Sequence, residues 1–254
     1  NFTHNLHSWT AIPACFPYRL MWLLSPFFAV FALFAAEESI ARERKEDSTP
    51  MVFPRPAGNM DYLLGKALGV WLAMMGAVGL FLVLIVVFGF VFAGVPVTFA
   101  GYVLIPFFMC GTSFVVLIGL AYAVAAMIGS RAARLGILLT VFWGVTFFVG
   151  SSYHALFDYS GRHMPLLYSD FTGFGDVAEI VTHRAMWFLA GLALMIFAVQ
   201  GLNRIPNSRK ERFISIAAAI VCLGGACALG YARLSDISSG QAVRDGMNAL
   251  SREV

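Results

Sequence analysis

The residues able to do acid, base or metal chemistry are gathered in polar segments between long apolar stretches. Residues 151–184, SSYHALFDYSGRHMPLLYSDFTGFGDVAEIVTHR, hold four acids and three histidines. Carboxylate and imidazole groups are common general acids and bases, but no nucleophile motif accompanies them. All five histidines of the chain lie outside the apolar stretches and none forms an HxxxH pair, which disfavours a metal or haem site. Solvated loop residues are therefore the better interpretation.

Two glycine-containing motifs resemble nucleotide-binding loops but fail in detail. Residues 58–67, GNMDYLLGKA, end in Gly-Lys, but Gly58 is too far from Gly65 for GxxxxGK[ST], and Ala67 replaces the hydroxyl that would hold magnesium. Residues 173–178, GFGDVA, fit GxGxxA, but no strand is predicted before them. We therefore predict no catalytic residue, no cofactor-binding residue and no metal ligand in this chain.

The elements that carry these segments are apolar stretches of membrane-spanning length. Of the 254 residues, 59% are hydrophobic and 12% are charged, and the mean hydropathy is +0.79. So few charges cannot cover a soluble globule. A helix needs about 20 apolar residues to cross the hydrocarbon core, and six stretches meet or approach this length: residues 20–36, 68–93, 102–128, 135–150, 185–202 and 213–232.

The distribution of charge predicts the orientation of the six spans. None of the apolar stretches contains Asp, Glu, Lys, Arg or His, so ionisable side chains are expected in connecting segments. Alternation places residues 41–66, 130–134 and 203–212 on one side, and these hold eleven of the seventeen basic residues. The positive-inside rule makes that side cytoplasmic. We expect a multi-pass protein of the inner (cytoplasmic) membrane with both ends outside, and a further span upstream of Asn1.

Glycines recur at helical spacing within the spans. Small residues let helices approach closely in lipid, where apolar contact alone gives no preference for protein over acyl chains. We therefore predict helix packing, rather than chemistry, at Gly65, Gly69, Gly76, Gly79, Gly111, Gly119 and Gly224.

The segment between the first two spans has a charged start and a proline-rich middle. Residues 37–47, EESIARERKED, place opposite charges four positions apart, which predicts a short helix that continues the span or lies along the membrane surface. Three prolines within residues 50–56 end this helix. Asp61 then begins a helix that runs into the next span, with Lys66 at the membrane surface.

This segment carries a family resemblance. RERKEDSTPMVFPRPAGNMDYLLGK, residues 42–66, resembles the segment ERxxGTxExLLxxPVxxxEYLLGK of ABC-2 type permeases, the membrane subunits of type-2 ABC exporters. Residues 166–204 likewise resemble the outside segment and last span of that family. Asp47-Ser48 stands where the family has Gly-Thr. The similarity extends over residues 20–204.

The resemblance completes the predicted architecture. We expect an all-α, polytopic transmembrane helix bundle with six spans, a cytoplasmic coupling helix and a short interfacial helical segment outside. Residues 1–204 would form the permease domain, 205–232 an additional span and 233–254 an extracytoplasmic tail.

The resemblance also implies a function and partners. The chain would be a non-enzymatic export permease that pairs with a second permease copy or paralogue in the lipid bilayer. A separate ABC ATPase subunit would bind ATP and magnesium, and no nucleic acid is involved. The residues implied in ATPase coupling are Arg42, Glu43, Arg44, Lys45, Glu46, Asp47, Asp61 and Lys66.

Two other functions stay open at this point. The chain could be a non-transporting anchor or assembly subunit of a larger complex, for example a redox complex. It could also be a channel or secondary carrier, which the absence of charges within the apolar stretches disfavours. The sequence does not identify a substrate.

Overall fold

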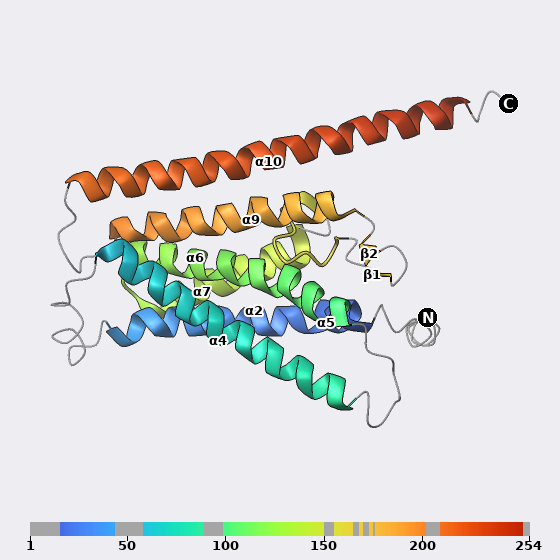
Figure 1. Ribbon diagram of the computed structural model, residues 1–254. Helices are drawn as coiled ribbons and strands as arrows, with labels where there is room; N and C mark the ends of the chain where they lie inside the picture. Colours follow the sequence, from blue (N-terminus) through green and yellow to red (C-terminus); the bar gives the residue numbers. More distant parts are fainter. Residues whose placement is uncertain are drawn as a thin grey trace.

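The computed structural model describes residues 16–43, 58–88, 99–149, 155–164, 168–169, 173–174, 176–201 and 209–250. Within these residues, six helices are long and apolar enough to span a membrane, and each contains most of one predicted stretch. Their order along the chain is shown in Figure 1. The predicted all-α bundle with six spans is therefore confirmed.

The six spans are built from the following elements. They are α2 (Phe16–Glu43), α4 (Asn59–Phe88), α5 (Phe99–Pro106) continued by η3 (Phe107–Gly111) and α6 (Thr112–Met127), α7 (Arg131–Trp143) continued by η4 (Gly144–Val149), α9 (Val177–Ala198) continued by η6 (Val199–Gly201), and α10 (Arg209–Leu250).

The segment between α7 and α9 contains little regular structure among its described residues. A 3₁₀ turn, η5 (Ala155–Phe157), precedes a turn at residues 158–164. Two-residue strands β1 (Tyr168–Ser169) and β2 (Gly173–Phe174) pair antiparallel, with Tyr168 opposite Phe174. Among the described residues between α7 and α9, the helical part is this one 3₁₀ turn.

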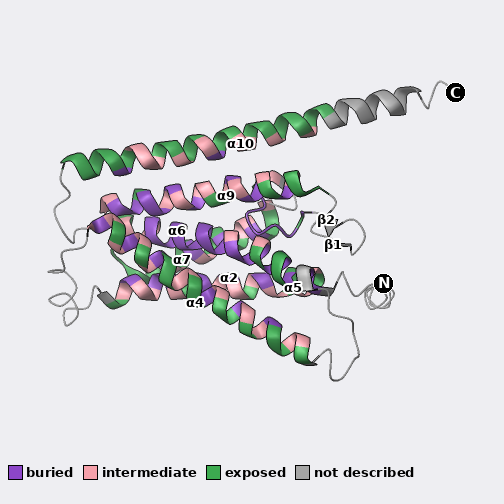
Figure 2. Cartoon of the chain, in the orientation of Figure 1, coloured by how far each residue is buried: buried purple, intermediate pink, exposed green. Residues whose placement is uncertain are grey.

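The central helix of the bundle is α6. In the apolar part of its span, Gly101–Met127, 72% of the residues are buried, against 17% for the spans of α4 and α10. It packs against both α9 and α2, whereas α10 packs mainly on α9 at the periphery. Figure 2 shows this gradient as a buried α6 between largely exposed α4 and α10.

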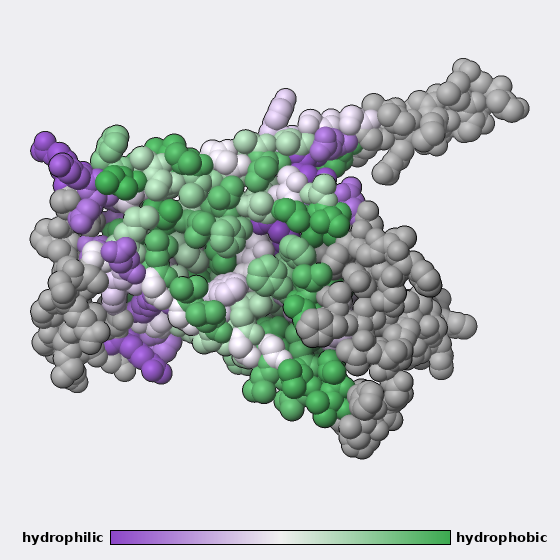
Figure 3. Space-filling model, viewed as in Figure 1, coloured by the Kyte–Doolittle hydropathy of each residue, from purple (hydrophilic) through white to green (hydrophobic). Residues whose placement is uncertain are grey.

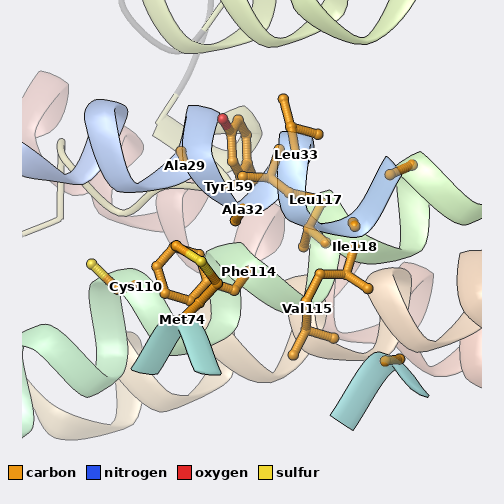
Figure 4. Close-up of a cluster of buried hydrophobic side chains, with 14 of the residues drawn as sticks. Ala29, Ala32, Leu33, Met74, Cys110, Phe114, Val115, Leu117, Ile118 and Tyr159 are labelled. Atoms are coloured by element: carbon orange, nitrogen blue, oxygen red, sulfur yellow. The ribbon is translucent and has the colours of Figure 1, made fainter. Parts of the chain in front are cut away.

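The core lies where α2, α4 and α6 meet. Phe114, Leu117 and Ile118 of α6 are almost completely buried among Ala32 and Leu33 of α2. Tyr159 from the turn after η5 joins the same cluster, as Figure 4 shows. The turn outside the spans is therefore anchored in the apolar core.

The closest helix approach is between α6 and α9. A Cβ atom added to Gly119 would lie 2.4 Å from the carbonyl oxygen of Gly191, so the predicted packing role of Gly119 is confirmed. Gly111 also has neighbours at ordinary contact distance. No described residue lies within 4 Å of a Cβ built at Gly65, Gly69, Gly76, Gly79 or Gly224, so packing at these five glycines stays a prediction.

Three of the helices depart from regular α-helical geometry at the same end of the bundle. Pro26 interrupts the hydrogen bonding of α2, because proline lacks a backbone N–H. The π-helical segment η3 interrupts the third span, between α5 and α6, and η4 interrupts regular α-helical geometry at the end of the fourth span, after α7. Trp71 Nε1 of α4 donates a hydrogen bond of 2.8 Å to the carbonyl oxygen of Gly111 in η3. Such π-helical segments occur frequently at functional sites.

The helices extend beyond the apolar stretches and take up charged residues that we assigned to connecting segments. That assignment is wrong for Glu37, Arg134, His183 and Arg184, which are helical and buried. Polar partners at the helix ends make this burial possible. Figure 3 shows a broad hydrophobic belt across the molecule, with hydrophilic residues gathered where α2 ends and α10 begins.

Candidate functional site

The predicted coupling segment is bounded by two continuous membrane helices. α2 runs without a break to Glu43, and α4 begins at Asn59 and runs to Phe88. The prediction that charged residues after the first span continue its helix is therefore confirmed as far as Glu43. Four of the predicted coupling residues, Arg44, Lys45, Glu46 and Asp47, lie outside the described residues.

The other predicted coupling residues lie on these two helices. Arg42 is exposed, and its Nε donates to Glu38 Oε1 at 3.1 Å, one helical turn earlier. Asp61 is exposed in the first turn of α4, where a carboxylate interacts favourably with the helix dipole. The Lys66 ammonium lies 5.6 Å from the centre of the Tyr62 ring.

A buried ion pair joins α2 to the first turn of α7. Arg134 donates from Nε and Nη2 to Glu37 Oε1 at 3.0 and 2.5 Å. The side chains of Arg134 and Glu37 are only 2% and 1% exposed. Arg131 also pairs with Glu37, at 3.3 Å from Nε to Oε2, and contacts Glu38. We refer to Glu37, Glu38, Arg131 and Arg134 as the Glu37–Arg134 cluster.

Arg134 also binds the end of α6. Its Nη1 donates to the carbonyl oxygens of Ile128 and Gly129 at 3.2 and 2.9 Å. A buried charge is tolerated only when it is paired and its remaining hydrogen-bonding groups are satisfied. Arg134 meets this condition through a carboxylate of α2 and two carbonyls that follow α6, so the ends of three helices are held together.

This cluster was missed by the sequence analysis. Glu37 follows the first apolar stretch directly, and Arg131 and Arg134 precede the fourth. Residues in such positions usually place their charges in the membrane interface. The spacing of Arg131 and Arg134 puts both on one helical face, but their pairing with Glu37, about ninety residues earlier in the chain, has no local sequence signal.

The opposite end of the bundle buries a second group of charges around Asp158. Its carboxylate accepts hydrogen bonds from the backbone nitrogens of Ser160, Gly161 and His163 at 3.0, 3.1 and 2.7 Å. Ser160 Oγ and His163 Nδ1 lie 2.6 and 3.1 Å from the same carboxylate. We refer to residues 158–164 as the Asp158 turn.

The hydrogen bonds within the Asp158 turn determine its ionisation. Burial raises the pKa of Asp158, but the hydrogen bonds from Ser160 and His163 and the nearby guanidinium of Arg184 outweigh this effect. The pKa of Asp158 therefore lies below its ordinary value, and the carboxylate is charged at neutral pH.

Two buried arginines surround this turn. Arg184 of α9 is 3% exposed and donates from Nη1 to the carbonyl oxygen of Tyr159 at 2.8 Å. The guanidinium of Arg162 is stacked 4.2 Å from the centre of the Trp22 ring. Tyr18 of α2 donates its hydroxyl proton to the carbonyl oxygen of Arg162 at 2.8 Å. The turn is thus attached to both α2 and α9.

The histidines and acids considered in the sequence analysis are not brought together as a metal centre. Among the residues that the structure describes, no group of three or more His, Cys, Asp or Glu side chains could hold a metal ion. His163 pairs with Asp158, and His183 is buried in α9.

Comparison with known protein families identifies the class of protein. The family described as ABC-2 family transporter protein matches residues 3–161. This match includes α2, the predicted coupling segment, α4 and the Glu37–Arg134 cluster. It ends before residues 166–204, whose resemblance to the family therefore stays a prediction.

Comparison with curated proteins and with solved structures found no match. The family match extends over more than half of the chain, and the six membrane-spanning helices agree with it. The chain therefore belongs to the ABC-2 family of transporter proteins, as a membrane permease component of an ABC transporter.

Proposed function

We propose that this chain couples ATP hydrolysis by a separate ABC ATPase subunit to the export of a substrate. The ATPase subunit would bind ATP and magnesium, and it would dock on residues 42–66. Arg42, Glu43, Arg44, Lys45, Glu46, Asp47, Asp61 and Lys66 would provide charged contacts for it. The class of substrate is left open.

The observation that supports this proposal most strongly is the continuity of α2 and α4 with the two ends of the charged segment. A force applied to residues 44–58 reaches the membrane through α4 and through α2, in which Pro26 lies closer to the other end of the helix. Coupling between distant sites requires such a physical connection. The pairing of Glu37 with Arg134 extends this connection to the first turn of α7.

The charge distribution supports a cytoplasmic location for this segment. The described helix ends on this side carry Arg42, Lys66, Arg131, Arg134, Arg209, Lys210 and Arg212. Cytoplasmic loops are enriched in such residues. We accordingly propose that the protein lies in the inner membrane, with the Glu37–Arg134 cluster on the cytoplasmic side and the Asp158 turn on the outside.

The exposed face of α4 supports pairing with a second permease copy or paralogue. No described residue lies within 4 Å of a Cβ built at Gly65, Gly69, Gly76 or Gly79. Beside this face, α4 and α5 enclose an apolar groove of about 430 Å³ lined by Val78, Leu82, Tyr102 and their neighbours. Small residues on an open helix face permit close approach of another transmembrane helix.

Co-purification of the two subunits tests the proposal. The chain would be expressed with a candidate ABC ATPase subunit from the same organism, extracted in mild detergent and captured through an affinity tag. We expect Arg44→Glu to reduce the recovered ATPase by about tenfold or more, because reversing one charge in an interface costs more than about 1.4 kcal/mol.

Lys210→Glu provides the matched control. Lys210 is an exposed basic residue at the start of α10, at the same end of the bundle. We expect this variant to recover as much ATPase as the unmodified chain. If Arg44→Glu and disruption of residues 42–48 both leave recovery unchanged, the docking proposal is wrong and an anchor or assembly subunit becomes the better interpretation.

A further inference from the structure

A small, mainly apolar cavity that also has hydroxyl-bearing residues in its lining lies at the end of the bundle where helical geometry is interrupted three times. The cavity measures about 10 Å³, which is about enough for one water-sized ligand. Its lining includes Pro26 of α2, Cys110 of η3 and Thr146 of η4. Each interruption therefore contributes to the wall of the same cavity.

The cavity is lined by hydroxyl groups, and one of them lacks a partner. Ser25 is 5% exposed, and its Oγ has no hydrogen-bond partner among the described residues. Thr146 Oγ1 and the Tyr159 hydroxyl are 2.8 Å apart. Because a single proton joins these two groups, one O–H of the pair is left to donate elsewhere. Two hydroxyl protons of the lining, that of Ser25 and one of the Thr146–Tyr159 pair, therefore have no acceptor among the described residues.

Two arginines near Asp158 also have nitrogen atoms without a hydrogen-bond partner among the described residues. Arg162 lines the cavity, is 8% exposed, and its Nε has no hydrogen-bond partner among the described residues. Arg184 similarly keeps Nε and Nη2 without a described partner. Asp158 is the carboxylate nearest to these two guanidinium groups, and its oxygens are already occupied by its own turn.

Water and a small anion differ in what they need from such a lining. A water molecule requires acceptors as well as donors, whereas an anion accepts hydrogen bonds only. Buried donors and buried charge without partners both cost free energy. A ligand that accepts from Ser25 and carries negative charge near Arg162 would remove both costs.

We propose that this cavity binds one small inorganic anion of the size of chloride. The ligand is recognised by hydroxyl groups from α2 and from the Thr146–Tyr159 pair and by the positive charge of Arg162. Binding holds α2, η4 and the Asp158 turn together at this end of the bundle.

The test is the thermal unfolding of the purified full chain in nanodiscs of neutral phosphatidylcholine. Sodium chloride is compared with sodium gluconate at equal ionic strength, because gluconate is too large for the cavity. We expect a saturable rise of the unfolding midpoint with chloride, of about 3 °C at roughly tenfold above Kd.

Variants separate this site from general salt effects. In gluconate, Ser25→Ala should be at least as stable as the unmodified chain, because it removes an unpaired buried hydroxyl. In chloride, it should lose the rise. Thr140→Ala, which removes an exposed hydroxyl of α7, should keep the rise.

Arg162→Gln tests the role of charge, with Arg131→Gln at the opposite end of the bundle as its control. The rise should disappear in Arg162→Gln and persist in Arg131→Gln. Equal midpoints in chloride and gluconate would overturn the proposal. So would a chloride effect that survives in Ser25→Ala, or stabilisation that appears only when acidic lipid is added to the nanodisc.

Discussion

The two ends of the helical bundle bury charge in different ways. In the Glu37–Arg134 cluster, each fully buried charge is hydrogen-bonded to an opposite charge from another helix. In the Asp158 turn, the carboxylate accepts hydrogen bonds from groups of its own turn, while Arg162 and Arg184 retain nitrogens that have no partner among the residues that the structure describes. The first arrangement joins helices directly. The second leaves capacity for a ligand.

The proposed coupling to an ATPase subunit would require different properties of the two ends. An end that receives force from an ATPase subunit needs rigid connections between helices, and a fully satisfied buried pair provides one. The other end contains Pro26 and the π-helical segments η3 and η4. Those irregularities weaken the regular helical hydrogen bonding there, so we expect the two ends to respond differently to substitution.

The largest expected effect follows from removing one partner of the buried pair. Glu37→Ala leaves Arg134 buried without its carboxylate, which costs about 3–5 kcal/mol, or roughly 10 °C in the unfolding midpoint. Replacing both residues with leucine should recover most of this loss. Glu38→Ala is the control, since Glu38 is partly exposed and its loss should cost less than about 1 kcal/mol. A double variant as unstable as Glu37→Ala would contradict this account of the cluster.

A smaller effect is expected from the glycines in the turns at the two ends. Gly161 has a positive φ of 72°, and a Cβ added there would lie 1.7 Å from Nη2 of Arg184. Gly161→Ala should therefore destabilise the protein by about 1–3 kcal/mol. Gly129, between α6 and α7, has no described neighbour within 4 Å of such an atom. Gly129→Ala should change stability by less than about 0.5 kcal/mol, and equal thermal shifts in the two variants would refute the contrast.

The smallest effect concerns the charge of Asp158. Asp158→Asn should lower stability by about 1–2 kcal/mol at pH 7, because hydrogen bonds to a charged acceptor are stronger than those to an amide. The folded-state pKa of Asp158 is lowered, so this contribution is present above the ordinary carboxyl pKa of about 3.9 and is lost as the pH falls through the folded-state value. The difference in unfolding midpoint should therefore be constant from pH 7 to about pH 5 and decrease only below about pH 4.

Asp176→Asn provides the comparison for that measurement. Asp176 caps α9 by accepting a hydrogen bond of 2.9 Å from the backbone nitrogen of Glu179. Asparagine caps helices about as well as aspartate, so this variant should differ little from the unmodified chain. A decrease of the Asp158→Asn difference already between pH 7 and pH 5 would contradict the lowered pKa.

The sequence was sufficient for the spans because their signal is local. A long apolar stretch predicts a membrane helix without knowledge of its neighbours, and all six predicted stretches lie largely within observed helices. The burial and pairing of charged residues at the helix ends could not be predicted in the same way. Burial of Glu37 and Arg134 depends on a contact between residues distant in sequence, and neither residue could be assigned a partner from its local context.

The glycines also show that a local sequence pattern does not identify the helix that will be contacted. Gly65, Gly69, Gly76 and Gly79 have a regular helical spacing, yet they face open space in this chain. Gly119 packs against Gly191, which lies in another helix. Spacing predicts which helix face is formed by small residues, but only the three-dimensional arrangement shows which helix packs against that face. The π-helical segments had no corresponding local signal.

The proposed docking of an ABC ATPase on residues 42–66 can be tested most directly by photo-crosslinking in intact cells. p-Benzoylphenylalanine would replace Lys45 in one strain and Lys210 in a control strain, and crosslinked products would be identified by mass spectrometry. The account predicts a light-dependent adduct with an ATP-binding subunit from position 45 and little or none from position 210. Absence of that adduct at position 45, or equal yields at both positions, would contradict the central claim.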